Sequence, residues 1–395
     1  MLSRLLPPGR DYSVVTRVKY SSISKKEHTV AIPLAKPIFS KEMETAAVDA
    51  LRNERFVLGE SVLKFEEEFA EYCGVDFAVS TSSGTAALSI ALTALNIKQG
   101  ASVITTPASF VATANSVLHS GCVPKFADID LETYNLDPER LEAAVETGTR
   151  AVIPVHLYGF PAEVDSMKEV AGKKGIAVVE DACQAHGALY KNRKVGSLGD
   201  VGCFSFYPSK NMTVAGDGGM LVTNDEKIAG KAGKLRDCGR QSKYVHDLIG
   251  YTARLNTVNA AIGRVQLSHL DEWNEKRRRN AETYDRLLSD VKGLHLPPAG
   301  DESTLPVYHL YVVRTSMRDG LKKWLESKGI ECGVHYTLPI HLQPIYQEMF
   351  GFKEGAFPNT EELCRTCLSI PMYPDLSEND VRFVCDQIHE FFEGR

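Results

Sequence analysis

A single lysine, Lys210, stands within residues 204–220, which read FSFYPSKNMTVAGDGGM. The stretch begins as an apolar strand and continues through Pro208 and Ser209 into a glycine-rich turn. A lysine that is held on such a turn and partly removed from water can lose its proton and act as a nucleophile. From this stretch alone, the alternative is a lysine solvated on a surface loop.

A second stretch, STSSGTAAL at residues 80–88, places Ser82, Ser83, Gly84 and Thr85 where a predicted strand ends and an apolar helix begins. The free N–H groups of a helix N-terminus and its dipole form a good binding site for a phosphate. Ordinary N-capping by a serine or threonine explains the same residues and is common. Both interpretations stay open at this point.

A third stretch, IAVVEDACQAHGA at residues 176–188, ends an apolar strand with Glu180 and Asp181, which Gln184 and His186 follow. A carboxylate at the end of a buried strand is costly unless it meets a cationic partner. The alternative is an acidic residue that only caps the next turn.

Together these stretches predict one site, because ligands of parallel α/β sheets bind at the carboxyl ends of the strands. A phosphate cradle, a carboxylate and a lysine match the phosphate, the pyridine nitrogen and the aldehyde of pyridoxal 5′-phosphate. Asp181 would keep the ring nitrogen protonated, and Lys210 would bind the aldehyde and move protons. Phe110 is placed to stack on the ring, although a core phenylalanine is the simpler explanation of that residue by itself.

The elements that position these residues alternate between strands and helices of about 10–15 residues, which favours βαβ units and a mostly parallel sheet. A long helix is expected at 257–289, followed by a smaller α+β part with a strand at 305–315. The expected strands of the first part are 77–83, 101–107, 123–130, 150–159, 176–182, 201–209 and 218–225. We therefore predict an α/β fold with a large domain at 30–275 and a small C-terminal domain at 276–395.

Residues 1–29 differ from the rest, with six Lys or Arg against two acidic residues. They are expected to form a flexible basic extension or to follow an alternative start, in preference to a transit peptide.

The whole chain of 395 residues carries a formal net charge of −6, which gives no support for nucleic-acid binding. No stretch reaches the roughly 18 apolar residues that span a membrane. The nine scattered cysteines indicate a reducing compartment, and we expect a cytoplasmic protein. Cys364 and Cys367 have CxxC spacing but no further ligands nearby, so we expect no metal and instead one helix with both thiols on one face.

Six motifs that follow one another at the expected spacings resemble the sugar aminotransferases of the DegT/DnrJ/EryC1/StrS family, which belong to fold type I of the pyridoxal-phosphate enzymes. The resemblance covers about residues 30–390 and rests on SGTAAL, TPASFVATANSVLHSGCVPKFADID, AVIPVHLYG, VVEDACQAHGA, GSLGDVGCFSFYPSKNMTVAGDGGM and NAAIGRVQL. It implies that Lys210 is the Schiff-base lysine, that Asp181 faces the pyridine nitrogen and that Gln184 binds the ring hydroxyl. It further implies that Thr85, Ala86 and Ser205 contact the phosphate and that Phe110 stacks on the ring.

The resemblance also implies a homodimer in which the segment IGYTARLN, residues 249–256, reaches the partner's site. Many relatives have an asparagine where this chain has Thr252, which leaves open whether Arg254 or another group contacts the phosphate. His186, His335 and Tyr336 are candidate substrate contacts.

The implied reaction moves an amino group from an amino acid, expected to be glutamate, to a nucleotide-linked ketosugar in aminosugar or polysaccharide biosynthesis. A dehydratase on the same scaffold is the alternative, but such relatives replace the lysine with histidine, and Lys210 is present. A regulatory relative would be expected to lose the lysine or to carry a DNA-binding segment. The sequence does not choose between a ketone at C3 and C4, or among UDP, dTDP and GDP.

Overall fold

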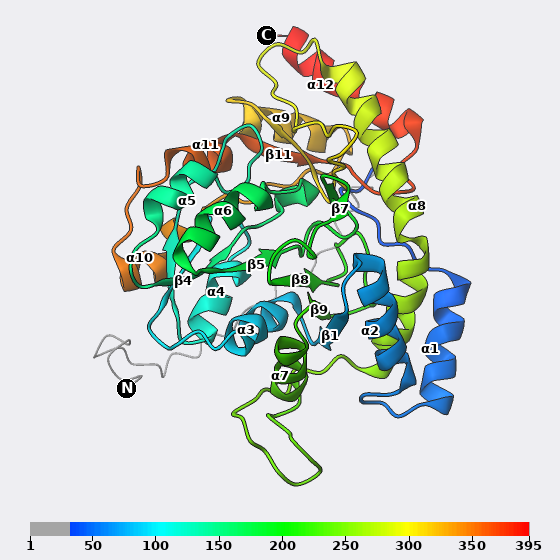
Figure 1. The fold of residues 1–395 in the computed structure, drawn as a ribbon. Helices are drawn as coiled ribbons and strands as arrows, with labels where there is room; N and C mark the ends of the chain where they lie inside the picture. The colour runs from blue at the N-terminus through cyan, green and yellow to red at the C-terminus, as the bar shows by residue number, and fades with distance from the viewer. Residues whose placement is uncertain (1–31, 395) are drawn as a thin grey trace, which may run out of the picture.

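The computed structural model describes residues 32–394 and is built around a seven-stranded sheet (Figure 1). The strand order is β1-β9-β8-β5-β4-β2-β3. Neighbouring strands from β8 to β3 are parallel, whereas β9 runs antiparallel to both β8 and β1. The predicted mostly parallel sheet is confirmed. Its strands are β1 (Phe77–Thr81), β2 (Ser102–Thr105), β3 (Val123–Phe126), β4 (Thr149–Ile153), β5 (Ala177–Asp181), β8 (Val201–Ser205) and β9 (Gly219–Thr223).

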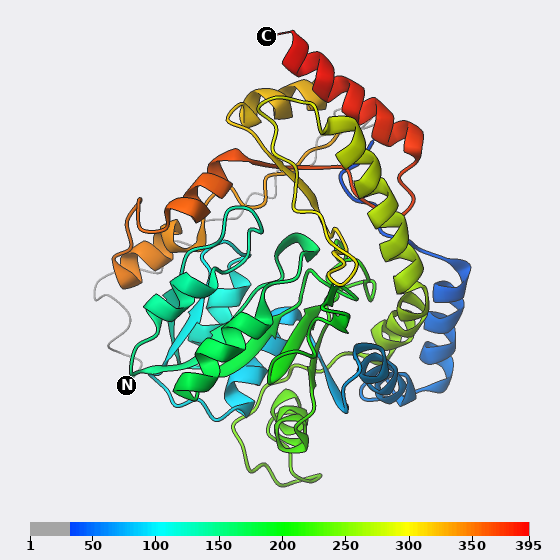
Figure 2. The same ribbon diagram turned by 45° about the horizontal axis from the view of Figure 1, so that its top comes forward.

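Helices cover both faces of this sheet (Figures 1 and 2). Apolar side chains fill the two interfaces. One face packs against α3 (Gly84–Ala94), α4 (Ala112–His119) and α7 (Glu226–Arg236). The other packs against α2 (Glu60–Cys73), α5 (Pro138–Ala144), α6 (Val164–Lys174) and the first half of α8 (Thr257–Leu288). Because both faces are covered, the strands are mostly apolar and do not alternate between apolar and polar residues, as is usual for parallel strands.

Helix α8 forms the connection between the two parts of the molecule (Figure 2). Its first half packs on α2 and on α1 (Lys41–Asn53), and its last turns join the core of the C-terminal part. That core also contains β10 (Tyr311–Arg314), β11 (Cys367–Ile370), α9 (Arg318–Ser327) and α12 (Glu378–Glu393). The proposed domain boundary at 275/276 therefore falls inside α8. Ile32 pairs with Ile330 and packs in the same core, so the described chain begins against the small domain.

Several predicted elements are shorter in the structure. The strand predicted at 150–159 ends at Ile153, since Pro154 and a short 3₁₀ turn follow it. The strand predicted at 305–315 is limited to β10. The remaining elements are the short strands β6 (Leu189–Tyr190) and β7 (Arg193–Lys194) and the helices α10 (Pro344–Phe350) and α11 (Pro358–Thr366).

The expectation for Cys364 and Cys367 was wrong in one respect. Helix α11 ends at Thr366, so Cys364 lies in the helix and Cys367 begins β11. Both thiols are buried and free.

The predicted basic extension at 1–29 lies outside the described residues. Within residues 32–394, no helix combines the length and apolarity needed to cross a bilayer.

Candidate active site

A cavity of about 450 Å³ opens at the carboxyl edge of the sheet. Helices begin or turns follow at this edge after β1, β2, β5 and β8, which brings their first residues together. Eight of the predicted site residues line this cavity: Thr85, Phe110, Asp181, Gln184, Ser205, Lys210, His335 and Tyr336.

Lys210 follows β8 by a short turn in which its N–H donates to the carbonyl of Tyr207 at 2.9 Å. Its side chain remains partly exposed, toward the cavity that it lines. Removal from water lowers the pKa of the Lys210 amine, while the neighbouring Asp181 carboxylate opposes that shift. A lowered pKa makes the neutral, nucleophilic amine more available, so the solvated-loop interpretation is not supported.

Asp181 is the last residue of β5 and is only 5% exposed. Its Oδ1 accepts the N–H of Cys183 at 3.2 Å, and its Oδ2 accepts the hydroxyl of Thr113 at 2.7 Å. No lysine, arginine or histidine of residues 32–394 forms an ion pair with it. A buried carboxylate without a cation is costly, so this group is suited to a ligand that brings a positive charge.

The N-terminus of α3 lies against the ends of β5 and β8. A Cβ atom on Gly84 would come within 2.7 Å of Ser205 Cβ and 2.8 Å of Cys183 Sγ, so only glycine permits this close approach. The capping interpretation is confirmed for Ser83, whose Oγ accepts the N–H of Ala86 at 3.1 Å. In the described structure, the N–H groups of Gly84 and Thr85 have no protein acceptor. They remain available to an anion in the cavity, whereas that of Ala86 is already engaged.

Aromatic and amide groups complete the walls. Phe110 is 55% exposed, so it is not a core residue, and its ring centroid lies 6.0 Å from that of Tyr336. Gln184 accepts the N–H of Tyr158 at 2.9 Å through Oε1, which turns its amide NH₂ toward Tyr336. The Nδ1 atom of His335 lies 2.9 Å from Ser369 Oγ.

Three predicted residues do not line the cavity. One is Ala86, in the first turn of α3; the others, His186 and Arg254, lie elsewhere in the described chain. His186 is fully buried against Phe204 and Phe206, and burial lowers its pKa to about 3. Its ring therefore occupies the core beneath β8 rather than the cavity. Arg254 pairs with Asp237 on the segment between α7 and α8, away from the cavity of its own chain.

The structure adds residues that the sequence did not indicate. His309 lines the cavity beside Lys210, its Nδ1 is buried without a partner, and burial holds its pKa well below the usual range. Ser109, Thr113 and Cys183 also line the cavity. Hydroxyls and thiols of this kind carry no spacing signal that separates them from ordinary helix and turn residues.

Glu180, the neighbour of Asp181, points to the opposite side of β5 and anchors the loop before β8. Its carboxylate accepts the N–H groups of Gly196, Leu198 and Gly199 at 2.7–2.8 Å. It also contacts His156 Nε2 at 2.9 Å. Since His156 Nδ1 accepts the N–H of Ala162, Nε2 carries the ring proton and donates it to Glu180.

Replacing Glu180 by alanine should therefore reduce stability rather than act on the chemistry directly. Several buried donors would lose their acceptor, and we expect a loss of about 3 kcal/mol or more in the free energy of unfolding. Urea unfolding measures this, with the exposed Glu169→Ala on α6 as the control. An unchanged unfolding midpoint in Glu180→Ala would contradict the anchoring role.

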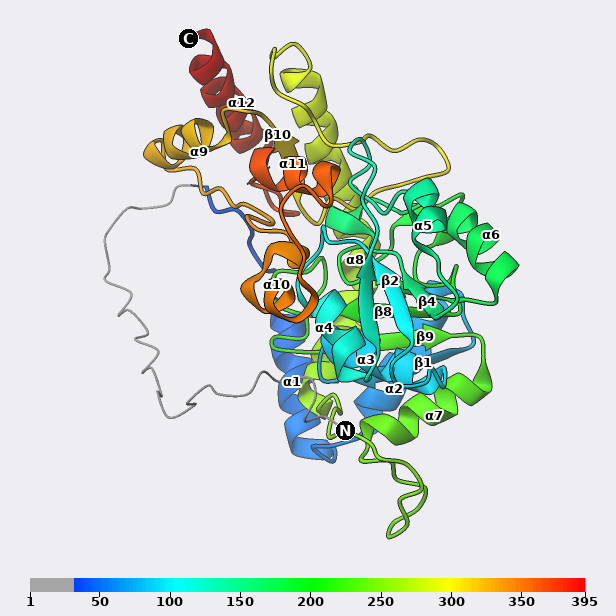
Figure 3. The ribbon, with the colours of Figure 1, turned by 90° about the vertical axis from the view of Figure 1, so that its left-hand side faces the viewer.

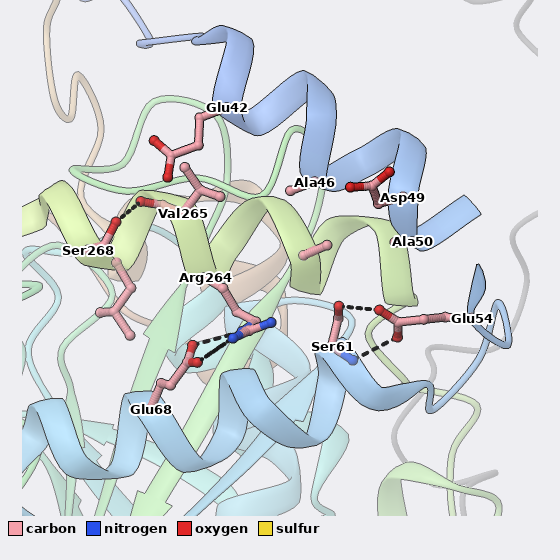
Figure 4. Close-up of a pocket in the computed structure, with 12 residues that line it drawn as sticks. Glu42, Ala46, Asp49, Ala50, Glu54, Ser61, Glu68, Arg264, Val265 and Ser268 are labelled. Atoms are coloured by element: carbon pink, nitrogen blue, oxygen red, sulfur yellow. Dashed lines mark hydrogen bonds and ion pairs between the residues drawn. The ribbon is translucent and has the colours of Figure 1, made fainter. Parts of the chain in front are cut away.

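A second cavity, of about 550 Å³, opens between α1, α2 and α8 (Figure 4). Two of its acidic side chains are already engaged, since Glu68 pairs with Arg264 at 2.6 Å and Glu54 accepts the N–H and hydroxyl of Ser61. None of the predicted site residues lines it.

Known proteins are similar to this chain in both sequence and fold. The model of the DegT/DnrJ/EryC1/StrS aminotransferase family matches residues 37–389. A pleiotropic regulatory protein of Geobacillus stearothermophilus is 42% identical over 345 residues, covering 87% of this chain and 92% of that protein. The dTDP-3-amino-3,4,6-trideoxy-alpha-D-glucose transaminase of Streptomyces venezuelae is 40% identical over 352 residues, covering 89% and 92%.

Among solved structures, DesV of S. venezuelae in complex with a ketimine intermediate superimposes with a TM-score of 0.87 at 40% identity. The match covers 89% of this chain and 94% of that chain. The predicted fold class is confirmed. The chain belongs to the DegT/DnrJ/EryC1/StrS aminotransferase family.

Proposed function

We propose that this protein is a pyridoxal-phosphate-dependent aminotransferase that carries an amino group from glutamate to a nucleotide-linked ketosugar. The observation that supports this most strongly is the cavity itself. It holds a desolvated amine, a buried carboxylate without a cation and the free N–H groups of a helix N-terminus. These groups occur in a chain of an aminotransferase family.

The cavity residues fit this cofactor. Asp181 offers its carboxylate to the ring nitrogen, and the N–H groups of Gly84 and Thr85, with the Ser205 hydroxyl, suit the phosphate. The exposed face of Phe110 suits the ring, and the amide NH₂ of Gln184 suits the ring hydroxyl. Ala86 is kept as a proposed phosphate contact only because it lies in the same helical turn, since its N–H already donates to Ser83.

When bound, the cofactor supplies an electron sink for the carbon from which a proton is removed. Lys210 Nζ holds the aldehyde in the resting protein and, once displaced, accepts the proton that leaves the α-carbon of the donor. In the second half of the reaction, the same amine returns a proton to the former carbonyl carbon of the sugar.

The proposed sugar side of the cavity consists of lining residues that are not assigned to the cofactor. It is formed by His309, His335 and Tyr336 together with Leu34 and Ala35 from the segment before α1. The Streptomyces relative is named for a sugar with an amine at carbon 3. We therefore propose that the ketone in the sugar substrate of this protein is also at carbon 3. We expect this reaction to serve aminosugar or polysaccharide biosynthesis in the cytoplasm.

A panel of UDP-, dTDP- and GDP-linked 3- and 4-ketosugars with ¹⁵N-glutamate tests the proposal. The expected product is a 3-aminosugar that contains the labelled nitrogen, detected by mass spectrometry. A sugar that loses an oxygen without gaining nitrogen would instead indicate the dehydratase. Cofactor binding without any sugar turnover would leave the amino-transfer proposal unsupported and favour a regulatory role.

We also propose a homodimer with shared sites. The outer part of the segment between α7 and α8, residues 240–249, extends away from the body of the molecule in two perpendicular views (Figures 1 and 3). It carries apolar side chains in solvent, with Tyr244 81% and Ile249 97% exposed. A protruding apolar segment of this kind is suited to burial against a second copy.

Mixing two impaired variants would show whether each active site is shared between the two subunits. Lys210→Ala removes the amine of one site, and Arg254→Ala should weaken cofactor binding at the partner's site by about tenfold or more. After dissociation and reassociation at limiting cofactor, mixed dimers should regain activity because one of their sites has both intact groups. A mixture that is no more active than its two components would show that each site is complete within one chain.

A further inference from the structure

Two buried hydroxyl groups connect the cavity wall to Asp181. The Thr113 hydroxyl lies 2.7 Å from Asp181 Oδ2, and Ser109 Oγ lies 2.8 Å from Thr113 Oγ1. Ser109, Thr113 and Asp181 are 4%, 1% and 5% exposed. All three residues line the cavity, so this hydrogen-bonded hydroxyl chain lies in the cavity wall and not in the remote core.

The direction of this chain follows from the number of protons. An ionised carboxylate only accepts hydrogen bonds, so the single hydroxyl proton of Thr113 points to Asp181. Thr113 then has no proton left for Ser109, and Ser109 must donate to Thr113. Both hydroxyls are thus aligned toward the carboxylate, and such a chain stabilises a negative charge at its end.

The hydroxyl chain also links two proposed cofactor contacts, Phe110 and Asp181, which belong to different elements. Ser109 directly precedes Phe110, Thr113 lies in the first turn of α4, and the N–H of Thr113 donates to the carbonyl of Phe110 at 3.1 Å. Asp181 comes from β5. The hydroxyl chain therefore fixes the carboxylate relative to the segment that carries the exposed aromatic ring.

Among the described residues, the Thr113 hydroxyl makes the shortest hydrogen bond to the Asp181 carboxylate. The other oxygen, Oδ1, accepts the backbone N–H of Cys183 at 3.2 Å, which is a longer contact. Without the Thr113 hydroxyl, this deeply buried carboxylate would lose its shortest hydrogen bond. It would then compete more strongly for the proton that a pyridine nitrogen brings to the site.

We propose that Thr113, supported by Ser109, is a positioning residue for amino transfer: it keeps Asp181 ionised and oriented, so that the shared proton resides on the cofactor's ring nitrogen. This role rests on the proposed function. It involves no bond to substrate or cofactor from either hydroxyl.

The location of the proton can be read directly by ¹⁵N NMR of the bound cofactor, with ¹⁵N in its pyridine ring. In Thr113→Val, the ring-nitrogen resonance should move toward that of neutral pyridine. The rate of the first half-reaction with glutamate should fall about tenfold, as expected for a lost hydrogen bond to a charged group. The affinity for the cofactor should fall by less than the rate, because neither hydroxyl contacts the cofactor, and the KM for glutamate should change little, because Thr113 does not contact the substrate.

Three further variants test whether the shift of the ring-nitrogen resonance depends on the hydroxyl chain. Thr113→Ser keeps the hydroxyl and should restore the wild-type resonance. Ser109→Ala should shift it in the same direction as Thr113→Val, but less. Ser116→Ala is the matched control, because Ser116 is a buried hydroxyl of the same helix that donates to the Thr113 carbonyl at 2.7 Å and does not reach Asp181. Its resonance should not move.

The proposal is overturned if Thr113→Val keeps the wild-type ¹⁵N resonance while Asp181→Asn loses it. If Thr113→Val does not fold, Ser109→Ala decides, and an unmoved resonance in that variant overturns the proposal. A wild-type protein that binds no pyridoxal phosphate would overturn the proposed function itself, which is a different result.

Discussion

Replacing Lys210 by alanine is expected to abolish covalent cofactor binding and to slow both half-reactions by about 10⁴-fold, near the upper range for a lost acid–base group. Lys210 is the only amine among the described residues that line the cavity. The cavity thiol of Cys183 cannot replace it, because burial raises its pKa well above the usual range and keeps it protonated. Stopped-flow absorbance with glutamate measures the first half-reaction.

The surface ion pair between Lys191 and Asp165 provides the control for this variant. Lys191 is 59% exposed and lies on the hairpin of β6 and β7, outside the cavity. Lys191→Ala should leave the spectrum and the rates unchanged. Normal turnover by Lys210→Ala, with intact folding, would refute the role assigned to this lysine.

The second large effect is expected for Asp181→Asn. Asparagine preserves the shape, and its side-chain oxygen can still accept the Thr113 hydroxyl, but the negative charge is gone. The ring nitrogen of the cofactor would no longer be held protonated, and removing one preorganised electrostatic partner costs about 10²–10³-fold in rate. We expect the cofactor to bind and to be poorly activated.

Two measurements separate activation from binding in this variant. The cofactor dissociation constant should rise modestly, whereas the rate of proton removal from glutamate should fall strongly. Asp165→Asn, from the same surface pair, is the matched control. Equal losses of affinity and rate would mean that Asp181 serves mainly to hold the cofactor and not to activate it.

Much of this site could be predicted because parallel strands end at one edge. Asp181 and Ser205 end strands that the apolar runs identify well, and Lys210 follows the second of these strands. Thr85 lies in the first turn of the helix that follows another strand. Their convergence in one cavity follows from topology, which short motifs are sufficient to indicate.

Other features depend on packing that a single sequence does not express. His186 was a candidate because it follows Asp181 closely, but the turn after β5 directs its ring into the core against Phe204. His309 was assigned to a strand that actually begins at Tyr311, so its place beside Lys210 was missed. The alignment of Ser109 and Thr113 on Asp181 arises between α4 and β5, and no local pattern distinguishes it from ordinary helix hydroxyls.

The most direct test of the central claim is the absorbance spectrum of the purified protein after addition of pyridoxal phosphate, repeated after glutamate. The account predicts a visible band from the covalent link to Lys210, which glutamate converts to one at shorter wavelength. The same band should be missing in Lys210→Ala. A wild-type protein that shows no such band with excess cofactor would contradict the assignment of Lys210 and, with it, the proposed aminotransferase.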